Sequence, residues 1–483
     1  MSRTHHRGAT RRSFLADTGL GFTGLALGAM FFRDGVGRAA DPMVGVESGP
    51  HHPAKAKNVI WIFLCGGVSH LESWDPKPAL NKYNGKSIAD TPFADAVKAE
   101  RKDVVEGNPK HGNRKMLMGL NCGTARYGKS GLLAADWWKH TAEMADDLAV
   151  VRTVWTTDND HGAMLQFHTG RHVREGAYPT IGSWACYGLG ALTGNLPEYV
   201  VLGVPPGDCC GGEWAHGAAY LGPEHAGVRL NLEGAPLPFG KLPAGKTAKE
   251  QADEFGLIGK LNRLSGIDYP DDPQVQARIK SYELAFKMQT AVPETLQLEK
   301  ESEKTRALYG VDRAETAAFG KICLTARRLV ERGVRFVQVY HGGGGGGDWD
   351  AHSKIKDNHT KLSTQTDKPI AGLLRDLKQR GLLKDTLVVW ATEFGRSPGA
   401  EGDGRDHHPQ AFSVWLAGGG IRGGVVHGKT DEIGFHGIED RHYVTDVHAT
   451  VLHQLGLDPR KLEVPGRKRL EIDFGEPITG IIG

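Results

Sequence analysis

Short runs of apolar residues recur along the chain and predict buried β-strands. The most continuous are residues 58–65 (NVIWIFLC), 148–155 (LAVVRTVW), 334–340 (VRFVQVY) and 386–391 (TLVVWA). Such runs, rich in β-branched and aromatic residues, are typical of strands that are covered on both faces in a parallel sheet. A less regular pattern predicts two further strands over 195–203 and 412–416.

Apolar residues spaced three or four positions apart predict helices between these strands. The pattern is clearest over 319–330, which ends at Gly333, a residue suited to a helix C-cap. Further helices are expected at 162–168, 273–288, 368–380 and 445–455. This alternation implies an α/β fold with a mostly parallel central sheet and helices on both faces. Residues from about 205 to 290 begin with a Gly/Pro-rich region and are expected to form a cap insertion.

Length and charge narrow the class of protein. The 483 residues, 39% of them hydrophobic, are enough for one large core. Lys and Arg number 59 against 57 Asp and Glu, so the formal net charge is +2 and no basic field indicates a nucleic-acid partner. The six cysteines show no metal-ligand spacing. Cys209 and Cys210 are neighbours, and one disulfide could form in an oxidising compartment.

The N-terminal residues have the pattern of an export signal. Residues 10–15 (TRRSFL) contain a twin arginine, and an apolar Gly/Ala-rich run follows over 20–32. We expect residues 1–39 to be a twin-arginine signal peptide and 40–57 a linker to the main domain at 58–478. The protein would then be exported by the Tat machinery to the periplasm or the extracellular space. No later stretch is apolar enough to span a bilayer, so no integral membrane segment is expected after signal removal.

A glycine-rich segment carries the most distinctive chemistry. The strand predicted at 334–340 leads into six consecutive glycines at 342–347, followed by Asp348, Asp350 and His352. Glycine lets a backbone approach a ligand closely, and carboxylate with imidazole is a common ligand set for divalent metals. Because open α/β sheets bind ligands beyond the carboxyl ends of their strands, a metal site is expected at this edge.

Three other predicted strands are followed by similar groups. The candidate metal ligands are Glu72, Asp75, Asp348, Asp350, His352, Glu393, His407 and His408. The candidate catalytic residues are Thr157, Asp160, His161 and Arg396. His407 and His408 precede a strand, so they would reach the same edge if that strand ran antiparallel or if the loop folded back.

Mixed carboxylate and imidazole ligands favour one or two zinc or manganese ions, whereas an all-oxygen set would suit calcium. Two such ions can hold the attacking and the leaving oxygen of a phosphate or sulfate ester. Arg396 or Arg171 could neutralise the remaining charge of the oxyanion. The expected substrate is therefore an ester of a small molecule or a glycan.

Five stretches together resemble one exported family. They are GGVSHLESWDPKP (66–78), GDWDAHS (347–353), ATEFGRSP (391–398), GRDHHPQAFSVWLAGGG (404–420) and TDVHATVLHQLGLD (445–458). The family is called domain of unknown function fifteen-oh-one and is often labelled sulfatase-like. The resemblance covers nearly the whole chain after the leader and implies an alkaline phosphatase/sulfatase fold.

The resemblance also implies roles for particular residues. Glu72 or Asp75 matches the first carboxylate of that superfamily, and His352 with Asp350 or Asp348 matches a later Asp–His pair. The last histidine matches His407 or His408. Glu393 and Phe394 stand where the superfamily has another Asp–His pair.

The chain departs from sulfatases at the nucleophile. It has no Cys/Ser-x-Pro-x-Arg signature. Counting back from the sulfatase-like Thr169-Gly170-Arg171, the nucleophile position falls near Asp160, and Thr157 is the nearest hydroxyl.

Three functional hypotheses follow. The first is a metal-dependent ester hydrolase in which metal-bound water, Thr157 or Asp160 attacks. The second is a non-catalytic member of the fold that binds a sulfated or phosphorylated glycan or a protein partner. The third, in which the ions are purely structural, is less favoured because structural sites are usually closed by protein ligands.

Overall fold

The central sheet is the framework of the molecule. The computed structural model describes residues 49–98, 111, 114–234, 291–464 and 475–483, with isolated positions between 247 and 288. Within this part, nine strands form one sheet in the order β12-β4-β11-β8-β1-β7-β5-β6, with β15 also paired to β4. The strands are β1 (Asn58–Leu64), β4 (Leu148–Trp155), β5 (Tyr199–Leu202), β6 (Val228–Arg229), β7 (Phe336–His341), β8 (Thr386–Ala391), β11 (Phe412–Ala417), β12 (Val425–His427) and β15 (His442–Tyr443).

Strand β1 lies at the centre of the sheet and is buried along its whole length. It pairs in parallel with β7 on one side and β8 on the other. Alternate side chains enter the two cores: Ile60 and Ile62 pack on one face, and Trp61 and Phe63 on the other. The apolar run therefore forms a two-sided strand, as the sequence predicts.

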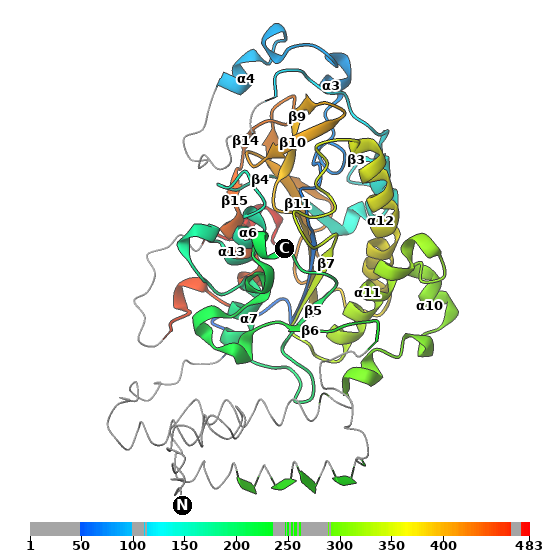
Figure 1. Ribbon diagram of the computed structural model, residues 1–483, viewed down its shortest axis with the longest axis vertical. Coiled ribbons are helices and arrows are strands. Elements are labelled where there is room, and N and C mark those ends of the chain that lie inside the picture. Colours follow the sequence, from blue (N-terminus) through cyan, green and yellow to red (C-terminus); the bar gives the residue numbers. More distant parts are fainter. Residues whose placement is uncertain are drawn as a thin grey trace, which may run out of the picture.

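Helices cover both faces of the sheet (Figure 1). On one side lie α11 (Ala314–Glu331) and α12 (Ile355–Gln379), which pack against each other. On the other side lie α6 (Ala163–Thr169), α7 (Ile181–Leu189) and α13 (Val444–Gln454). The α/β class with a mostly parallel, helix-covered sheet is confirmed.

Two predicted helices differ from what the sequence indicates. The pattern predicts 368–380, but α12 begins at Ile355 and contains Pro369. Its first half buries polar residues such as His359 and Thr366, so no apolar stripe is visible there. The helix expected at 273–288 lies outside the described residues, apart from Met288.

The expected cap region is described only in part. Residues 208–225 form short 3₁₀ helices: Asp208–Cys210, Gly212–His216, Ala219–Leu221 and Pro223–His225. The expected signal peptide and most of the linker lie outside the described residues. Among the helices described, none combines the length and the apolar character needed to cross a membrane.

Strand β11 runs antiparallel to both of its neighbours, β4 and β8. Before it, the chain forms a hairpin of β9 (Gly395–Glu401) and β10 (Gly404–His408). Because β11 starts at the edge where the parallel strands end, this hairpin lies beside the loops that follow β1, β4 and β7. The sequence analysis left open whether this strand runs antiparallel. Because β11 does so, His407 lies at this edge.

Candidate metal centre

Asp350 lies where four basic side chains meet. Its Oδ1 atom is 3.1 Å from Nε2 of His352, 3.2 Å from Nε2 of His407 and 2.8 Å from Nη2 of Arg396. Its Oδ2 atom is 3.2 Å from Nε2 of His161. These partners follow β4 and β7 or lie on the β9–β10 hairpin, so the structure gathers them at the predicted edge of the sheet.

The protons on two of these imidazoles can be assigned from their outer contacts. Nδ1 of His407 is 2.8 Å from the carbonyl oxygen of Asn159, and Nδ1 of His352 is 2.5 Å from Oε2 of Glu401. Both oxygens only accept hydrogen bonds, so each Nδ1 carries the proton of the neutral ring. The two Nε2 atoms, 3.1 Å apart, then present lone pairs to each other and to Oδ1 of Asp350. Lone pairs that converge in this way fit a bound cation.

The spacing of these three atoms suits a small divalent ion. Tetrahedral ligands at zinc, bound at about 2.0–2.1 Å, lie about 3.3 Å from one another. The separations among Oδ1 of Asp350 and the two Nε2 atoms of His352 and His407 are 3.1–3.2 Å. Two imidazoles and one carboxylate also form a donor set common at zinc.

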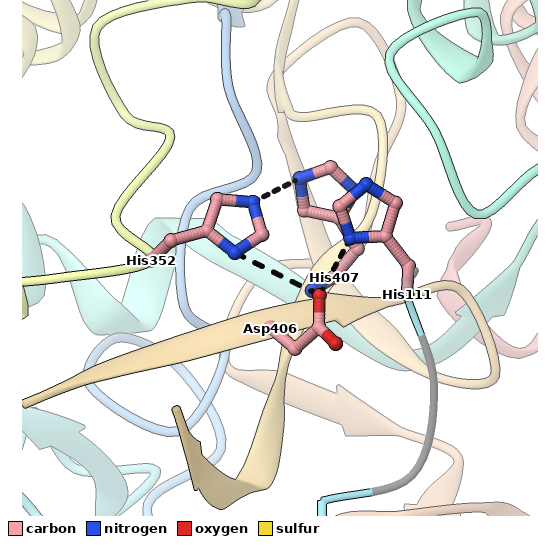
Figure 2. Close-up of side chains that lie close together, drawn as sticks. All are labelled: His111, His352, Asp406 and His407. Carbon is pink, nitrogen blue, oxygen red and sulfur yellow. Dashed lines mark hydrogen bonds and ion pairs between the residues drawn. The ribbon is translucent and has the colours of Figure 1, made fainter. Parts of the chain in front are cut away.

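Asp406 and His111 extend the centre on one side (Figure 2). Ligand atoms of His111, His352, Asp406 and His407 all lie within 4.8 Å of one another. Oδ1 of the buried Asp406 is 2.8 Å from Nδ1 of His111, and its Oδ2 is 2.6 Å from Nη2 of Arg114. The His111 ring stacks on the His407 ring, with centroids 4.0 Å apart.

His161 and Asp160 extend the centre on another side. Ligand atoms of Asp160, His161 and His407 also lie within 4.8 Å of one another. Nδ1 of His161 is 3.3 Å from Oε1 of Glu393, while its Nε2 faces Asp350. Burial lowers the pKa of His161, but the two carboxylates outweigh it and raise this pKa to about 9. A positive charge, either a proton or a metal ion, is therefore favoured at this ring.

Asp350 and His407 are in the forms that bind metal, whereas the neighbouring Asp350 and Glu401 raise the pKa of His352. Burial raises the pKa of Asp350, but the close imidazoles of His161, His352 and His407 and the charge of Arg396 lower it far below its ordinary value. Burial lowers the pKa of His407 to about 3. At neutral pH the centre thus holds a carboxylate anion and a neutral imidazole, which are the ligating species.

The backbone after β1 supports Glu393. The N–H of Gly66 donates to both Glu393 oxygens, at 2.9 and 3.2 Å. Gly66 has a φ of +118°, and a Cβ atom there would lie 2.5 Å from the backbone nitrogen of Asp350. Glycine is required at this position because both the dihedral angle and the space exclude a side chain.

The two carboxylates predicted after β1 have other partners. Oε1 of Glu72 is 2.7 Å from Nη2 of Arg405, and both side chains are fully buried. Oδ1 of Asp75 is 3.0 Å from Nζ of Lys77 and 3.4 Å from Nε of Arg152. In the contacts described, neither carboxylate takes part in the convergence on Asp350.

Three further candidates lie apart from Asp350 in the described contacts. Nε2 of the buried His408 is 2.6 Å from the carbonyl oxygen of Phe435. The Thr157 hydroxyl accepts a hydrogen bond of 2.6 Å from Nε2 of Gln166. Asp348 is exposed, next to the glycine-rich loop.

Sequence reasoning missed three residues of the centre. His111 lies outside any predicted element, and nothing in its neighbourhood marks it. Glu401 follows a predicted strand end by ten residues and reaches His352 only because β9 folds back. Asp406 directly precedes the His407-His408 pair within the motif at 404–420. A carboxylate next to two candidate ligands could therefore have been recognised as a third.

The chain belongs to the family described as "Protein of unknown function (DUF1501)", whose model matches residues 56–482. The family resemblance carried by the five motifs is therefore confirmed. No curated protein matches the sequence.

Three solved structures illustrate what the chain is similar to. The PsFucS1 sulfatase from Pseudoalteromonas sp. is 12% identical, with 84% of this chain and 69% of that chain covered and a TM-score of 0.35. The phosphonate monoester hydrolase SpPMH from Silicibacter pomeroyi is 10% identical, with 88% and 76% covered and a TM-score of 0.38. The alkaline phosphatase from the Antarctic bacterium TAB5 is 10% identical, with 84% and 100% covered and a TM-score of 0.33.

Proposed function

We propose that this protein is a metal-dependent hydrolase of phosphate or sulfate esters. The observation that carries the proposal is the convergence of His352 Nε2, His407 Nε2 and Asp350 Oδ1, with their lone pairs directed at one point. Asp160 and His161 on one side of this point, or His111 and Asp406 on another, could hold a second ion. Zinc or manganese suits the mixed nitrogen and oxygen donors better than calcium.

When bound, the metal supplies Lewis-acid activation of an ester oxygen and of a water nucleophile. The chain's own residues supply the rest. Glu401 and the Asn159 carbonyl fix the two imidazoles through their Nδ1–H groups. His161, between two carboxylates, can hold a proton at Nε2 beside Asp350 and give it to a leaving oxygen.

Arg396 is better placed to orient Asp350 than to bind substrate. It is fully buried, its Nε donates to the carbonyl oxygen of Gly67 at 2.8 Å, and its Nη2 lies 2.8 Å from Oδ1 of Asp350. We therefore propose a positioning role for this residue.

Thr157 is a weak candidate for the nucleophile. Its hydroxyl oxygen is engaged with Gln166, and the same Nε2 lies 2.6 Å from the hydroxyl of Tyr443. The Thr157→Ala variant is expected to keep activity within about threefold of the parent, since no bond to the reacting atoms is lost. A complete loss with intact folding would assign the nucleophile to Thr157 instead.

The test combines metal analysis with turnover of aryl phosphates and aryl sulfates. The purified chain should contain zinc or manganese, lose activity on chelation and recover it when the ion is restored. Asp350→Asn should lose most of the metal and at least about 100-fold in activity, because one ligand and the anchor of three imidazoles are removed. Asp357→Asn, at an exposed carboxylate in the first turn of α12, is the matched control.

Two outcomes would oppose the proposal. If the purified chain binds no metal ion and no added ion restores turnover, the proposal of a metal-dependent hydrolase is wrong. If the ion binds at Asp350 but neither ester class is turned over, the non-catalytic binding protein is favoured.

We also propose export by the twin-arginine route, on the basis of Arg11 and Arg12 and the apolar run that follows. Replacing both arginines by lysine should retain the full-length precursor in the cytoplasmic fraction. A precursor that is still processed and exported would exclude this route.

A further inference from the structure

Two neighbouring cysteines at the rim of the glycine-rich loop have their sulfur atoms unusually close. Cys209 and Cys210 end the short 3₁₀ helix Asp208–Cys210, and their Sγ atoms are 2.7 Å apart. Non-bonded carbon atoms prefer about 3.5–4.0 Å, and sulfur is larger than carbon. A disulfide bond measures about 2.03–2.05 Å. The pair is thus closer than two separate thiols would sit and needs only a small movement to bond.

The same two sulfurs contact the glycine-rich loop. Sγ of Cys210 is 3.2 Å and Sγ of Cys209 is 3.7 Å from the carbonyl oxygen of Gly345. As thiols, both can donate an S–H to this oxygen. The backbones also meet, because the N–H of Gly344 donates to the carbonyl oxygen of Pro205 at 2.8 Å.

The loop in turn lies against the candidate metal centre. A Cβ atom on Gly346 would be 2.9 Å from Cδ2 and Nε2 of His161. The ring that faces Asp350 is therefore covered by the residue that follows Gly345. The sulfurs contact Gly345, and the next residue, Gly346, contacts His161. A change at the sulfurs can therefore reach the centre through the loop.

We propose that Cys209 and Cys210 form a reversible vicinal disulfide that controls how the glycine-rich loop is held over the metal centre. The oxidant is a small-molecule or protein disulfide. The Cys209 thiolate attacks one of its sulfurs and releases the first thiol. The Cys210 sulfur then attacks Sγ of Cys209, the second thiol leaves, and one new S–S bond replaces the one that was broken.

The environments of the two cysteines support this order of attack. Cys209 is exposed, so an oxidant can reach it, whereas Cys210 is buried. Burial, and then the neighbouring Cys209, raise the pKa of the Cys210 thiol, so it is less suited to the first attack. Cys210 instead acts once the mixed disulfide has placed an electrophilic sulfur beside it.

Two consequences follow from ring closure. The Gly345 carbonyl oxygen loses both S–H donors, so the loop is held less firmly next to His161. The bond should also be easily reduced, because neighbouring Cα atoms are about 3.8 Å apart and disulfides prefer about 4.4–6.8 Å. Strained, exposed disulfides of this kind are the labile ones.

The experiment compares the full chain after treatment with diamide and after treatment with dithiothreitol. Thiols are alkylated under denaturing conditions, and cleavage after Glu198 and Glu213 isolates residues 199–213, which contain these two cysteines and no other. After reduction, we expect this peptide to carry two alkyl groups. After oxidation, we expect it to carry none and to be lighter by two hydrogen atoms than the unalkylated dithiol peptide. Oxidised Cys209→Ser and Cys210→Ser should lack this modification, while Cys122→Ser should retain it.

Hydrogen exchange measures the effect on the loop. We expect the amides of 344–347 to exchange several-fold faster in the oxidised parent, and no redox dependence in Cys209→Ser. Two free thiols after diamide, or a disulfide that joins two chains, would overturn the modification. An intramolecular disulfide with unchanged exchange would overturn its control of the loop. Both readouts are independent of turnover, so they stand apart from the proposed hydrolase activity.

Discussion

The Nε2 atoms of His352 and His407 lie 3.1 Å apart, although the two residues are separated by 55 positions in the sequence. Each ring is turned toward the other because its Nδ1–H donates outward, to Glu401 in one case and to the Asn159 carbonyl in the other. The outer hydrogen bonds therefore decide which lone pairs face inward. The metal affinity of the centre should depend on them as well as on the ligands.

Glu401→Ala tests this dependence. Without the carboxylate, Nδ1 of His352 loses the acceptor that fixes its proton and orients its ring, so metal affinity should fall by about 10–100-fold. Competition with a chromophoric chelator measures the change. Glu439→Ala, at an exposed carboxylate that ends β14 (Gly437–Glu439), should bind as the parent does. Equal affinities for both variants would show that Glu401 does not orient the ligand.

Glu72→Gln separates a structural role from ligation. The buried ion pair with Arg405 would be broken with its cation left behind, which costs about 3 kcal/mol in the free energy of unfolding. Denaturant unfolding measures this cost, and the exposed Glu303→Gln is the control. The metal content of the folded variant should equal that of the parent. Loss of metal with unchanged stability would instead make Glu72 a ligand, as the sequence suggested.

His448 should make the fold sensitive to acid. It is buried on α13, its Nε2 lies 2.7 Å from the carbonyl oxygen of Phe167, and burial lowers its pKa to about 4. The unfolded chain takes up this proton near pH 6.5, so stability is full above that pH and falls until about pH 4. Between pH 7.5 and 4.5 this one group accounts for about 2.5 kcal/mol.

The variant His448→Gln should therefore lose less stability than the parent on acidification, even if it is less stable at neutral pH. Unfolding midpoints at pH 7.5 and 4.5 measure the difference between the two proteins. His140→Gln, at a partly exposed ring on α5 (Lys139–Ala142), should keep the pH dependence of the parent. Parallel losses in His448→Gln and the parent would contradict the assignment.

Gly346→Ala tests how closely the loop must approach the centre. The added Cβ would meet Cδ2 and Nε2 of His161 at 2.9 Å, so the ring or the loop must shift. If His161 serves as proposed, turnover should fall about tenfold or more, because small displacements of reacting groups are costly. Gly194→Ala, where a Cβ meets nothing within 4 Å, is the control. Unchanged turnover in Gly346→Ala, with turnover shown for the parent, would remove His161 from the mechanism.

Much of the fold could be predicted from the sequence. The runs at 148–155 and 386–391 coincide with β4 and β8, since a strand buried on both faces must be apolar along its length. The alternation of predicted helices and strands indicated a parallel sheet. Because parallel strands end at the same edge, this arrangement also predicted that Asp350, His352 and Glu393 lie at one edge.

Tertiary structure alone decided which of the candidate residues meet. Glu72 and Asp75 follow a correctly predicted strand, yet their carboxylates face the distant Arg405 and Arg152, which no local pattern indicates. His407 and His408 are neighbours, and the extended β10 turns one toward Asp350 and the other toward Phe435. A sequence records which groups lie at an edge, but the direction of a side chain depends on strand pairing and on partners far away in the chain.

Asp350, His352 and His407 come from distant segments and meet at one edge of the sheet. The proposal of a bound metal ion depends on this meeting. The sequence determined the sheet, its edge and the kind of chemistry there. The hairpin that turns back along the antiparallel β11 determined the geometry, because only it brings His407 to face His352.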